Sequence, residues 1–340
     1  MKTVLFAAHD VGGGNAIMPL VHALSGRQGY AVRCLIGGPS KALFHKEGIP
    51  YVDADALDMK TLLARAKKDR PDILVSGTSA QTAFEKKLIP PLRNAGVKTI
   101  AVLDFWAHYR ERFSSPRKPL AYMPDVICVP DVRARREMIA DGFPSSRLAI
   151  TGNPYFDSFS KMRNKKAEQR RTILFVSQPT SDRVKEFGFQ EFRVLEDLLA
   201  ATRDLKGDYT VVIRPHPKEA EGKFKSYRAK DVVIDESSPI EKLLARAGLV
   251  VGMNSMVLYQ AAVAGKKVIS YQPGLKTQDY LPSNAAGLSR LARNRKQFIG
   301  LMNQYARGTF PAKRVSRKSA LVPHATQNII NLIKQYEEKR

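Results

Sequence analysis

The sequence predicts an α/β protein built from two tandem Rossmann-like domains, each with a doubly wound parallel sheet. Short apolar runs rich in β-branched residues alternate with helical stretches along most of the 340 residues, which is the pattern of parallel sheets. The alternation occurs twice, on either side of a polar, strongly basic stretch at 158–171. A chain of this length can also bury two separate cores.

The stretch 249–273 shows the repeating unit most clearly. It predicts, in order, a strand, a helix and a second strand, at 249–251, 256–264 and 267–271. Such a unit joins parallel strands through a right-handed crossover. Asn254 and Ser255 then lie at the amino end of the helix, where N–H groups and the helix dipole favour a phosphate. An ordinary connection without a ligand is the alternative, and this stretch alone does not decide between the two.

The first half of the chain predicts a series of strands, most of them followed by a helix or a turn. These strands are expected at 3–8, 30–36, 49–52, 73–76, 99–103 and 126–129. Between the first strand and a helix from Ala16 we expect a glycine-rich loop. Three consecutive glycines there, Gly12, Gly13 and Gly14, let a ligand approach the backbone closely. The spacing is not that of a dinucleotide-binding GxGxxG motif.

The second half predicts a similar series and a final amphipathic helix. Strands are expected at 173–176, 210–213 and 232–234, and helices at 189–203 and 240–247. The expected organisation is an N-terminal domain, a basic linker, a C-terminal domain and a last helix that packs back toward the N-terminal domain. Their expected bounds are 1–157, 158–171, 172–322 and 323–340.

Composition indicates a negatively charged partner and a reducing compartment. The formal charge is +24, from 56 basic and 32 acidic side chains, which suits nucleotide phosphates, nucleic acid or an anionic membrane surface. The two cysteines, Cys34 and Cys128, stand in separate apolar runs without disulfide or zinc spacing. We expect no signal peptide, because the apolar run at the start of the sequence is too short for one, and there is no run of 18 apolar residues. We therefore expect a cytoplasmic protein, with contact to the inner membrane face left open.

The string Asp53-Ala54-Asp55 invites comparison with metal-binding glycosyltransferases. It directly follows an expected strand, where an aspartate commonly caps the next helix. We favour the capping interpretation and expect no metal.

Four segments resemble the GT-B superfamily, which holds nucleotide-sugar glycosyltransferases and UDP-N-acetylglucosamine 2-epimerases. They are Gly12–Asn15, the segment RLAITGNPYFD at 147–157, Arg214–Pro217, and Asn254–Ser255 with Ala261 and Gly265. The third is similar to the His-Pro motif of CMP-sialic-acid-dependent and polymer glycerophosphate transferases. The resemblance covers nearly the whole chain and implies two domains that face a cleft.

The resemblance further implies that the second domain binds the donor nucleotide. The leaving phosphate gathers negative charge, which arginine and helix N-termini stabilise without a metal or cofactor. The expected donor residues are Arg214, His216, Pro217, Ser177, Gln178, Asn254, Ser255 and Gln260. Many relatives hold the ribose hydroxyls with a glutamate where this chain has Gln260. An amide accepts hydrogen bonds more weakly than a carboxylate, so this contact is open.

The acceptor hydroxyl must lose a proton, and the strand ends of the first domain carry the candidate bases. They are Asp10, Asp104 and His9. Successive strand residues point to opposite faces, so His9 and Asp10 share one role only if the chain turns there. Loop capping is the alternative for both aspartates.

Further acceptor-side candidates are Gly12, Gly13, Gly14, Asn15, Trp106 and His108. Trp106 and Tyr109 either stack on a sugar or pack the face of the domain.

The predicted function is metal-independent transfer of a sugar from a UDP- or CMP-type donor to a glycan or lipid-linked acceptor, in surface polysaccharide biosynthesis. One alternative is a UDP-sugar 2-epimerase or hydrolase on the same fold. A relative without catalysis is another, because of Gln260. Nucleic-acid binding along Arg290–Lys318 is less favoured, since that basic stretch contains few aromatic residues, namely Phe298, Tyr305 and Phe310.

Overall fold

The fold was analysed in a computed structural model that describes residues 1–79, 84–162, 171–311 and 322–337. The chain divides into two compact units. Unit 1 comprises Met1–Asp157 together with Leu321–Arg340, and unit 2 comprises Ser158–Ala320.

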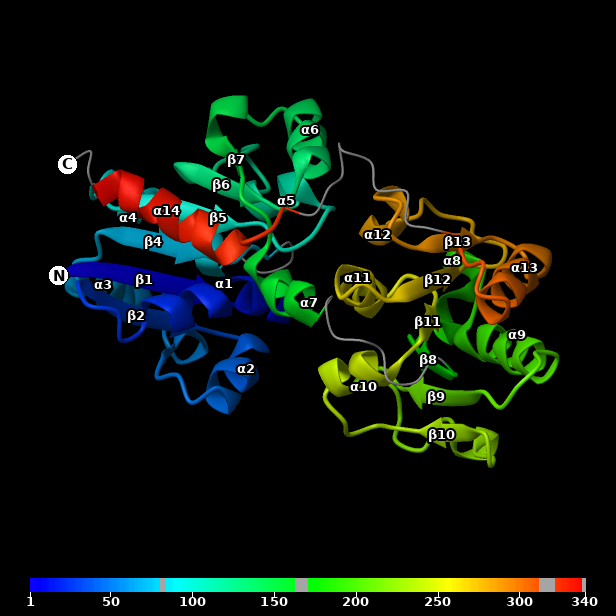
Figure 1. Ribbon diagram of the computed structural model, residues 1–340. Helices are drawn as coiled ribbons and strands as arrows, with labels where there is room; N and C mark the ends of the chain where they lie inside the picture. Colours follow the sequence, from blue (N-terminus) through cyan, green and yellow to red (C-terminus); the bar gives the residue numbers. More distant parts are fainter. Residues whose placement is uncertain (80–83, 163–170, 312–321, 338–340) are drawn as a thin grey trace. The chain divides into compact units, whose positions relative to one another are not determined.

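Unit 1 is built on a seven-stranded, entirely parallel sheet (Figure 1). Its strand order is β3-β2-β1-β4-β5-β6-β7. The strands are β1 (Lys2–Ala8), β2 (Tyr30–Ile36), β3 (Val52–Asp53), β4 (Ile73–Ser76), β5 (Lys98–Val102), β6 (Val126–Val129) and β7 (Leu148–Ile150). β1 pairs with β2 on one side and with β4 on the other, so it is an interior strand of the sheet.

Helices cover both faces of this sheet. Val4, Phe6 and Ala8 of β1 pack in one apolar cluster, whereas Leu5 and Ala7 pack in another, as expected when side chains alternate along a strand. The first cluster includes residues of α1 (Val11–Leu24) and α14 (Ala325–Glu337), and the second includes residues of α3 (Met59–Lys68) and α4 (Phe84–Asn94). The other helices are α2 (Ser40–Lys46), α5 (Tyr109–Phe113) and α6 (Val132–Ala140), with α7 (Asp157–Lys161) at the boundary with unit 2.

Unit 2 is built on a six-stranded parallel sheet with the order β10-β9-β8-β11-β12-β13. The strands are β8 (Thr172–Val176), β9 (Thr210–Arg214), β10 (Val232–Ile234), β11 (Leu249–Gly252), β12 (Lys267–Tyr271) and β13 (Arg290–Ala292). The helices are α8 (Val184–Phe187), α9 (Glu191–Arg203), α10 (Ile240–Arg246), α11 (Met256–Val263), α12 (Pro282–Ala285) and α13 (Arg295–Ala306). The predicted fold class, two parallel-sheet α/β domains in tandem, is confirmed.

Several elements differ from the sequence-based expectation, and the edge strands β7 and β13 and the helix α13 were not expected at all. The loop at 77–79 predicts a helix after it, which is α4, but the sequence predicts no bounds for it. Pro90 and Pro91 lie inside α4, where proline normally interrupts a helix. Strand β3 starts at Val52 and not at residue 49. Helix α7 extends into the expected linker at 158–171, of which residues 163–170 lie outside the described residues.

The basic stretch that prompted the nucleic-acid alternative contains β13 and α13, and its residues 312–318 lie outside the described part of the chain. Its aromatic residues belong to the core of unit 2. Phe298 is fully buried and stacks on Tyr271 with ring centroids 4.3 Å apart. Tyr305 is 7 % exposed and Phe310 packs on the same cluster. These rings are therefore not available to stack on bases.

The segment TGNPYFD at 151–157 docks the C-terminal helix α14 on unit 1. Gly152 has φ +84°, and a Cβ there would lie 2.7 Å from Cβ of Ala325. The two carboxylate oxygens of Asp157 accept from the backbone N–H groups of Ala325 and Thr326 at 3.1 and 2.8 Å, capping the amino end of α14. The segment that resembles GT-B enzymes thus binds the start of α14 and holds the C-terminal helix on unit 1.

Within the described ranges, no helix combines the length and the apolar character needed to span a bilayer.

The close approach of Gly152 to α14 predicts a specific stability loss. Gly152→Ala adds the cost of a left-handed backbone, about 1–2 kcal/mol, to an overpacking cost of about 1–3 kcal/mol. Gly96→Ala is the matched control, because Gly96 has φ +82° but open space around its missing Cβ. The measurement is urea unfolding followed by fluorescence of Trp106, the one tryptophan of the chain, which lies in unit 1. Equal losses in both variants would contradict the docking role.

Candidate functional site

Each sheet contains one switch point, where the chain connections on the two sides run toward opposite edges of the sheet. In unit 1 the point lies between β1 and β4, and in unit 2 it lies between β8 and β11, because the strand order reverses there. Open parallel sheets bind ligands at the carboxyl ends of the strands at such a point. The loops that follow these strands are therefore the first places to look for a site.

In unit 2 a hydrogen bond joins the two loops at this point. The backbone N–H of Asn254, after β11, donates to Oε1 of Gln178, after β8, at 3.0 Å. Ser255 caps α11, because its hydroxyl oxygen accepts from the N–H of Val257 at 3.2 Å. Ser255 and Gln178 therefore hold the loop. The N–H groups of Val257 and Leu258 both bond to Ser255, so what this end of α11 offers an anion is chiefly the helix dipole.

His216, two residues beyond β9, is held as a neutral hydrogen-bond donor. Its Nδ1 accepts from the N–H of Lys218 at 3.1 Å, so in the neutral ring the proton is carried by Nε2. Burial lowers the pKa of His216, although Glu219 opposes this. An Nε2–H group of this kind suits a phosphate oxygen. Pro217 next to it is exposed.

A buried charge cluster, Glu191–Lys223–Glu219, positions the loops around His216. Glu219 accepts from the Ser177 hydroxyl at 2.8 Å, from the N–H of His216 at 2.7 Å and from Nζ of Lys223 at 2.9 Å. The side chains of Glu219 and Glu191 are 0 % exposed. The Ser177 hydroxyl donates its one hydrogen bond to Glu219. In this arrangement Ser177 therefore fixes the loop and does not donate to a ligand.

Glu191 ties the same cluster to the loop after β8. It accepts from the N–H and the hydroxyl of Thr180 at 3.0 and 2.9 Å, from the hydroxyl of Ser181 at 2.6 Å, and from Lys223. Burial alone would raise its pKa, but the hydrogen bonds, led by that from Lys223, lower the pKa of Glu191 to about 2. Glu191 is therefore a permanent anion, and Lys223 is the cation that balances it.

Two further donor candidates are less accessible. Nη1 of Arg214 donates to the carbonyl of Asp235 at 3.0 Å and lies 3.9 Å from its carboxylate, so the guanidinium is anchored to the end of β10. Gln260 lies in α11 and is 5 % exposed. The ribose contact of Gln260 stays a prediction.

In unit 1 the chain turns after β1 so that His9 and Asp10 form a pair. Nδ1 of His9 lies 2.9 Å from Oδ1 of Asp10, and the side chains are 20 % and 39 % exposed. The imidazole lies against Gly38, where an added Cβ would come within 2.6 Å of three ring atoms. A carboxylate on Nδ1 leaves Nε2 free to take a proton, which is the arrangement of a general base.

Asp104 has a different environment. Its Oδ1 accepts from Nη1 of Arg112 at 2.5 Å and from the hydroxyl of Thr78 at 2.8 Å, and Arg112 is buried. Proton uptake on that oxygen would break a buried ion pair, so Asp104 serves better as an anchor for the loops after β4 and β5. The structure favours the His9–Asp10 pair as the base.

The expected glycine loop is wrong, because α1 begins at Val11 and includes all three glycines. They are needed for close packing and not for a loop conformation. An added Cβ would lie 2.1 Å from Asp104 Oδ2 at Gly12, 3.2 Å from Gly77 Cα at Gly13 and 2.4 Å from Ser40 Oγ at Gly14. Asn15 is a half-buried residue of the same helix.

The aromatic acceptor candidates are part of the core. Trp106 is 4 % exposed and its indole N–H donates to Asp131 at 2.7 Å. Tyr109 donates to Glu137 at 2.7 Å. Of the two alternatives, these residues pack the domain. The His108 side chain is 66 % exposed, and its backbone has φ +57°, a rare conformation for a residue other than glycine.

The Asp53-Ala54-Asp55 string caps a turn. Asp53 accepts from the N–H of Asp55 at 3.0 Å, and Nζ of Lys41 lies 3.0 and 2.9 Å from the carboxylates of Asp53 and Asp55. Lys41 occupies the place between the two carboxylates. Across the part of the chain that is described, no group of three or more histidine, cysteine or acidic residues could hold a metal ion.

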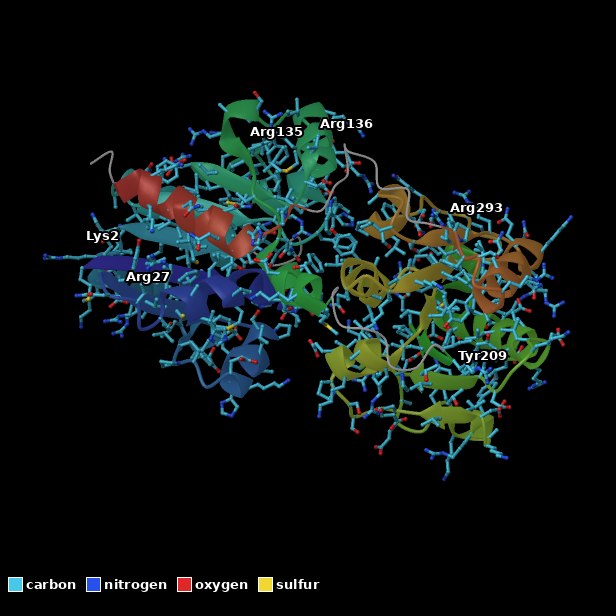
Figure 2. The ribbon with its side chains drawn as sticks, viewed as in Figure 1. Lys2, Arg27, Arg135, Arg136, Tyr209 and Arg293 are labelled. Atoms are coloured by element: carbon cyan, nitrogen blue, oxygen red, sulfur yellow. The ribbon has the colours of Figure 1, made fainter. Side chains whose placement is uncertain are left out.

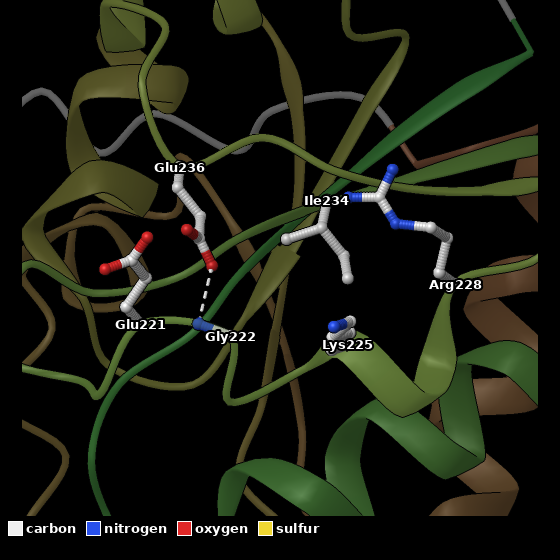
Figure 3. A pocket seen from close by; sticks show the side chains of 6 residues that line it. All are labelled: Glu221, Gly222, Lys225, Arg228, Ile234 and Glu236. Carbon is white, nitrogen blue, oxygen red and sulfur yellow. Dashed lines mark hydrogen bonds between the residues drawn. The ribbon is translucent and has the colours of Figure 1, made fainter.

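A surface hollow of about 650 Å³ lies at the carboxyl end of the edge strand β10 (Figure 3). Its lining residues are Glu221, Gly222, Lys225, Arg228, Ile234 and Glu236. Charged groups of both signs surround it and none of the predicted donor residues lines it, so we do not place the donor site there.

Sequence reasoning missed the residues that hold the loops. They are Thr78, Arg112, Glu191, Glu219 and Lys223. The spacing of Glu219 and Lys223, four residues apart, was the only local signal, and it is common on protein surfaces.

Comparison with known proteins agrees with this description. The family model for alpha-2,8-polysialyltransferases matches residues 139–272. A UDP-N-acetylglucosamine 2-epimerase from Methanocaldococcus jannaschii is 12 % identical, with a TM-score of 0.71, and the match covers 98 % of this chain and 100 % of that one. The same enzyme from Neisseria meningitidis, solved with UDP-GlcNAc bound, is 12 % identical, with a TM-score of 0.68 and coverages of 98 % and 100 %.

MurG from Acinetobacter baumannii is 15 % identical, with a TM-score of 0.62 and coverages of 98 % and 100 %. No curated protein sequence matches this chain significantly. These likenesses establish the GT-B fold of the chain.

The Glu191–Lys223–Glu219 cluster predicts a large stability loss when its cation is removed. Lys223→Met leaves two buried carboxylates uncompensated, and breaking a buried pair in this way costs about 3–5 kcal/mol. Arg183→Met is the matched control, because the Arg183–Glu186 pair is exposed and such pairs contribute little. Unfolding followed by circular dichroism checks both variants. Similar curves for Lys223→Met and wild type would show that the cluster does not support the fold.

Proposed function

We propose that this protein is a glycosyltransferase that binds a nucleotide-sugar in unit 2 and deprotonates an acceptor hydroxyl with the His9–Asp10 pair of unit 1. The observation that carries the proposal is a connected row of loops across three adjacent strands of unit 2. His216 is linked through Glu219 to Ser177, and Gln178 beside it is linked to Asn254. This row ends at the amino terminus of α11, which favours a phosphate.

The comparisons support the donor class. The matched polysialyltransferase family is named for a sugar transfer, and a structural neighbour binds UDP-GlcNAc. A uridine or cytidine nucleotide is therefore the donor that we propose. The charge on the departing phosphate would be stabilised by the His216 Nε2–H and by the dipole of α11, without a metal or cofactor.

The acceptor class rests on the surface charge. Basic side chains are exposed on both units, among them Arg27, Arg136 and Arg293 (Figure 2), and the formal net charge is +24. A polyanionic glycan or a glycan linked to an anionic membrane would be attracted by this surface. We propose an acceptor of this kind, in the synthesis of surface polysaccharide.

Nucleotide binding tests the donor site. Uridine or cytidine diphosphate or monophosphate is expected to raise the melting temperature of the protein, because it binds the native state preferentially. His216→Asn keeps an acceptor for the Lys218 N–H but loses the Nε2 donor. The variant is expected to bind the nucleotide roughly ten- to a hundredfold more weakly, because a hydrogen bond to a charged group contributes about 1.5–3 kcal/mol to the binding free energy. His45→Ala, an exposed histidine of unit 1, is the control. Unchanged affinity in His216→Asn would remove His216 from the site.

A second candidate function is sugar epimerisation or hydrolysis, because two of the structural neighbours described above are UDP-GlcNAc 2-epimerases. Incubation with UDP- and CMP-sugars alone separates the two functions. No conversion is expected until a glycan or lipid-linked acceptor is added, and His9→Ala is expected to lower the transfer rate about 10²- to 10⁴-fold as the loss of a general base. Conversion of the donor without acceptor would favour the epimerase or hydrolase.

A further inference from the structure

Unit 1 buries a carboxyl group, that of Glu85, which the proposed reaction does not use. Glu85 stands in the first turn of α4 and is 1 % exposed. The Ser79 hydroxyl donates to its Oε1 at 2.7 Å. Among the described residues, the second oxygen, Oε2, has no hydrogen-bond partner. An acidic residue in the first turn of a helix usually interacts with the helix dipole while exposed to solvent. That interaction does not explain why Glu85 is buried.

Residues 77–79, which follow β4, belong to the switch point of unit 1. Gly77 packs against Gly13 in the first turn of α1, where an added Cβ would lie 2.7 Å from Gly13 Cα. Thr78 is bound to Asp104, and Ser79 is bound to Glu85. The carboxyl of Glu85 is therefore linked through Ser79 to the residues that contact α1 and Asp104, and it is near enough to Asp10 and Asp104 for their charges to act on it.

The surrounding charges favour the neutral form of Glu85. Burial raises the pKa of Glu85 to about 8, the Ser79 bond opposes this rise, and the carboxylates of Asp10 and Asp104 add to it. Two cations lie near, but both are engaged elsewhere. Nζ of Lys86 donates to the carbonyl of Glu111 at 2.7 Å, and Arg112 is paired with Asp104. No nearby cation binds Glu85 directly among the described residues.

We propose that Glu85 is a positioning residue of the unit 1 site, which is neutral while the site works and adds a third negative charge beside Asp10 and Asp104 when it ionises. The neutral form keeps the loop of Gly77 and Ser79 packed behind the His9–Asp10 pair. The ionised form changes the proton affinity of that pair and sets an alkaline limit to its use. The catalytic meaning of this role rests on the proposed function, but the coupling of Glu85 to His9 is a property of unit 1 alone.

Nuclear magnetic resonance of the His9 ring tests the coupling without a substrate. The Cε1–H signal of His9 is identified by its loss in His9→Gln and followed from pH 5 to pH 10. In the wild type it is expected to show a second inflection near pH 8 from Glu85. This inflection is expected to vanish in Glu85→Gln, which imitates the neutral form, and to move to higher pH in Ser79→Ala, which removes the bond that lowers the pKa. A wild-type signal without that inflection, or one that survives in Glu85→Gln, overturns the proposal.

Stability provides an independent test. Between its ordinary pKa of 4.5 and about 8, Glu85 keeps a proton in the folded chain that it releases in the unfolded chain. Its contribution therefore falls as pH rises through this window and is constant above it. The melting temperature of Glu85→Gln minus that of wild type is expected to grow from pH 5 to pH 8 and then level off.

A difference in melting temperature that does not change with pH contradicts the inference. If Glu85→Gln does not fold, the shift in Ser79→Ala decides. If both tests succeed but no sugar transfer is found, the inference stands and the proposed function fails.

Discussion

The parallel pairing of β8 with both β9 and β11 is the constraint on which the candidate donor site depends. Because these strands run in the same direction, the loops after all three emerge at one edge of the sheet. Residues 177, 216 and 254 are far apart in the sequence and are brought together only by this pairing. A buried ion cluster then fixes the loops: Glu219 binds two of them, and Lys223 joins it to Glu191. The sheet thus brings the three loops together, and the Glu191–Lys223–Glu219 cluster holds them in place.

Unit 1 uses the same topology with different chemistry. Its switch point is tightly packed, because glycines of α1 and of the loop after β4 allow their backbones to touch. That packing leaves the His9–Asp10 pair partly exposed at the edge, while Asp104, Arg112 and Thr78 form a closed network behind it. An accessible pair in front of a fixed network is suited to moving a proton without disturbing the loop.

The sequence was sufficient for most strands of both sheets, but not for the edge strands β7 and β13 or for the contacts that the candidate site residues make. Strands such as β2, β4 and β12 carry strong apolar patterns and were predicted to the residue. The extent of helix α4 could not be predicted, since tertiary packing tolerates prolines that local propensity disfavours. The glycines of α1 were taken for a loop because their packing partners, Asp104, Gly77 and Ser40, are distant in sequence. The same limit explains why Ser177 was expected to bind phosphate: its partner Glu219 is 42 residues away.

The docking of α14 has a consequence for how the protein is made. Unit 1 is discontinuous, and Ile329, Ile330 and Ile333 fill the same apolar cluster as β1. During synthesis the first 157 residues leave the ribosome without these side chains, whereas unit 2 emerges as one continuous segment. The earlier-made domain must therefore wait for the end of translation to complete its interior, and the later-made one can reach its native packing first.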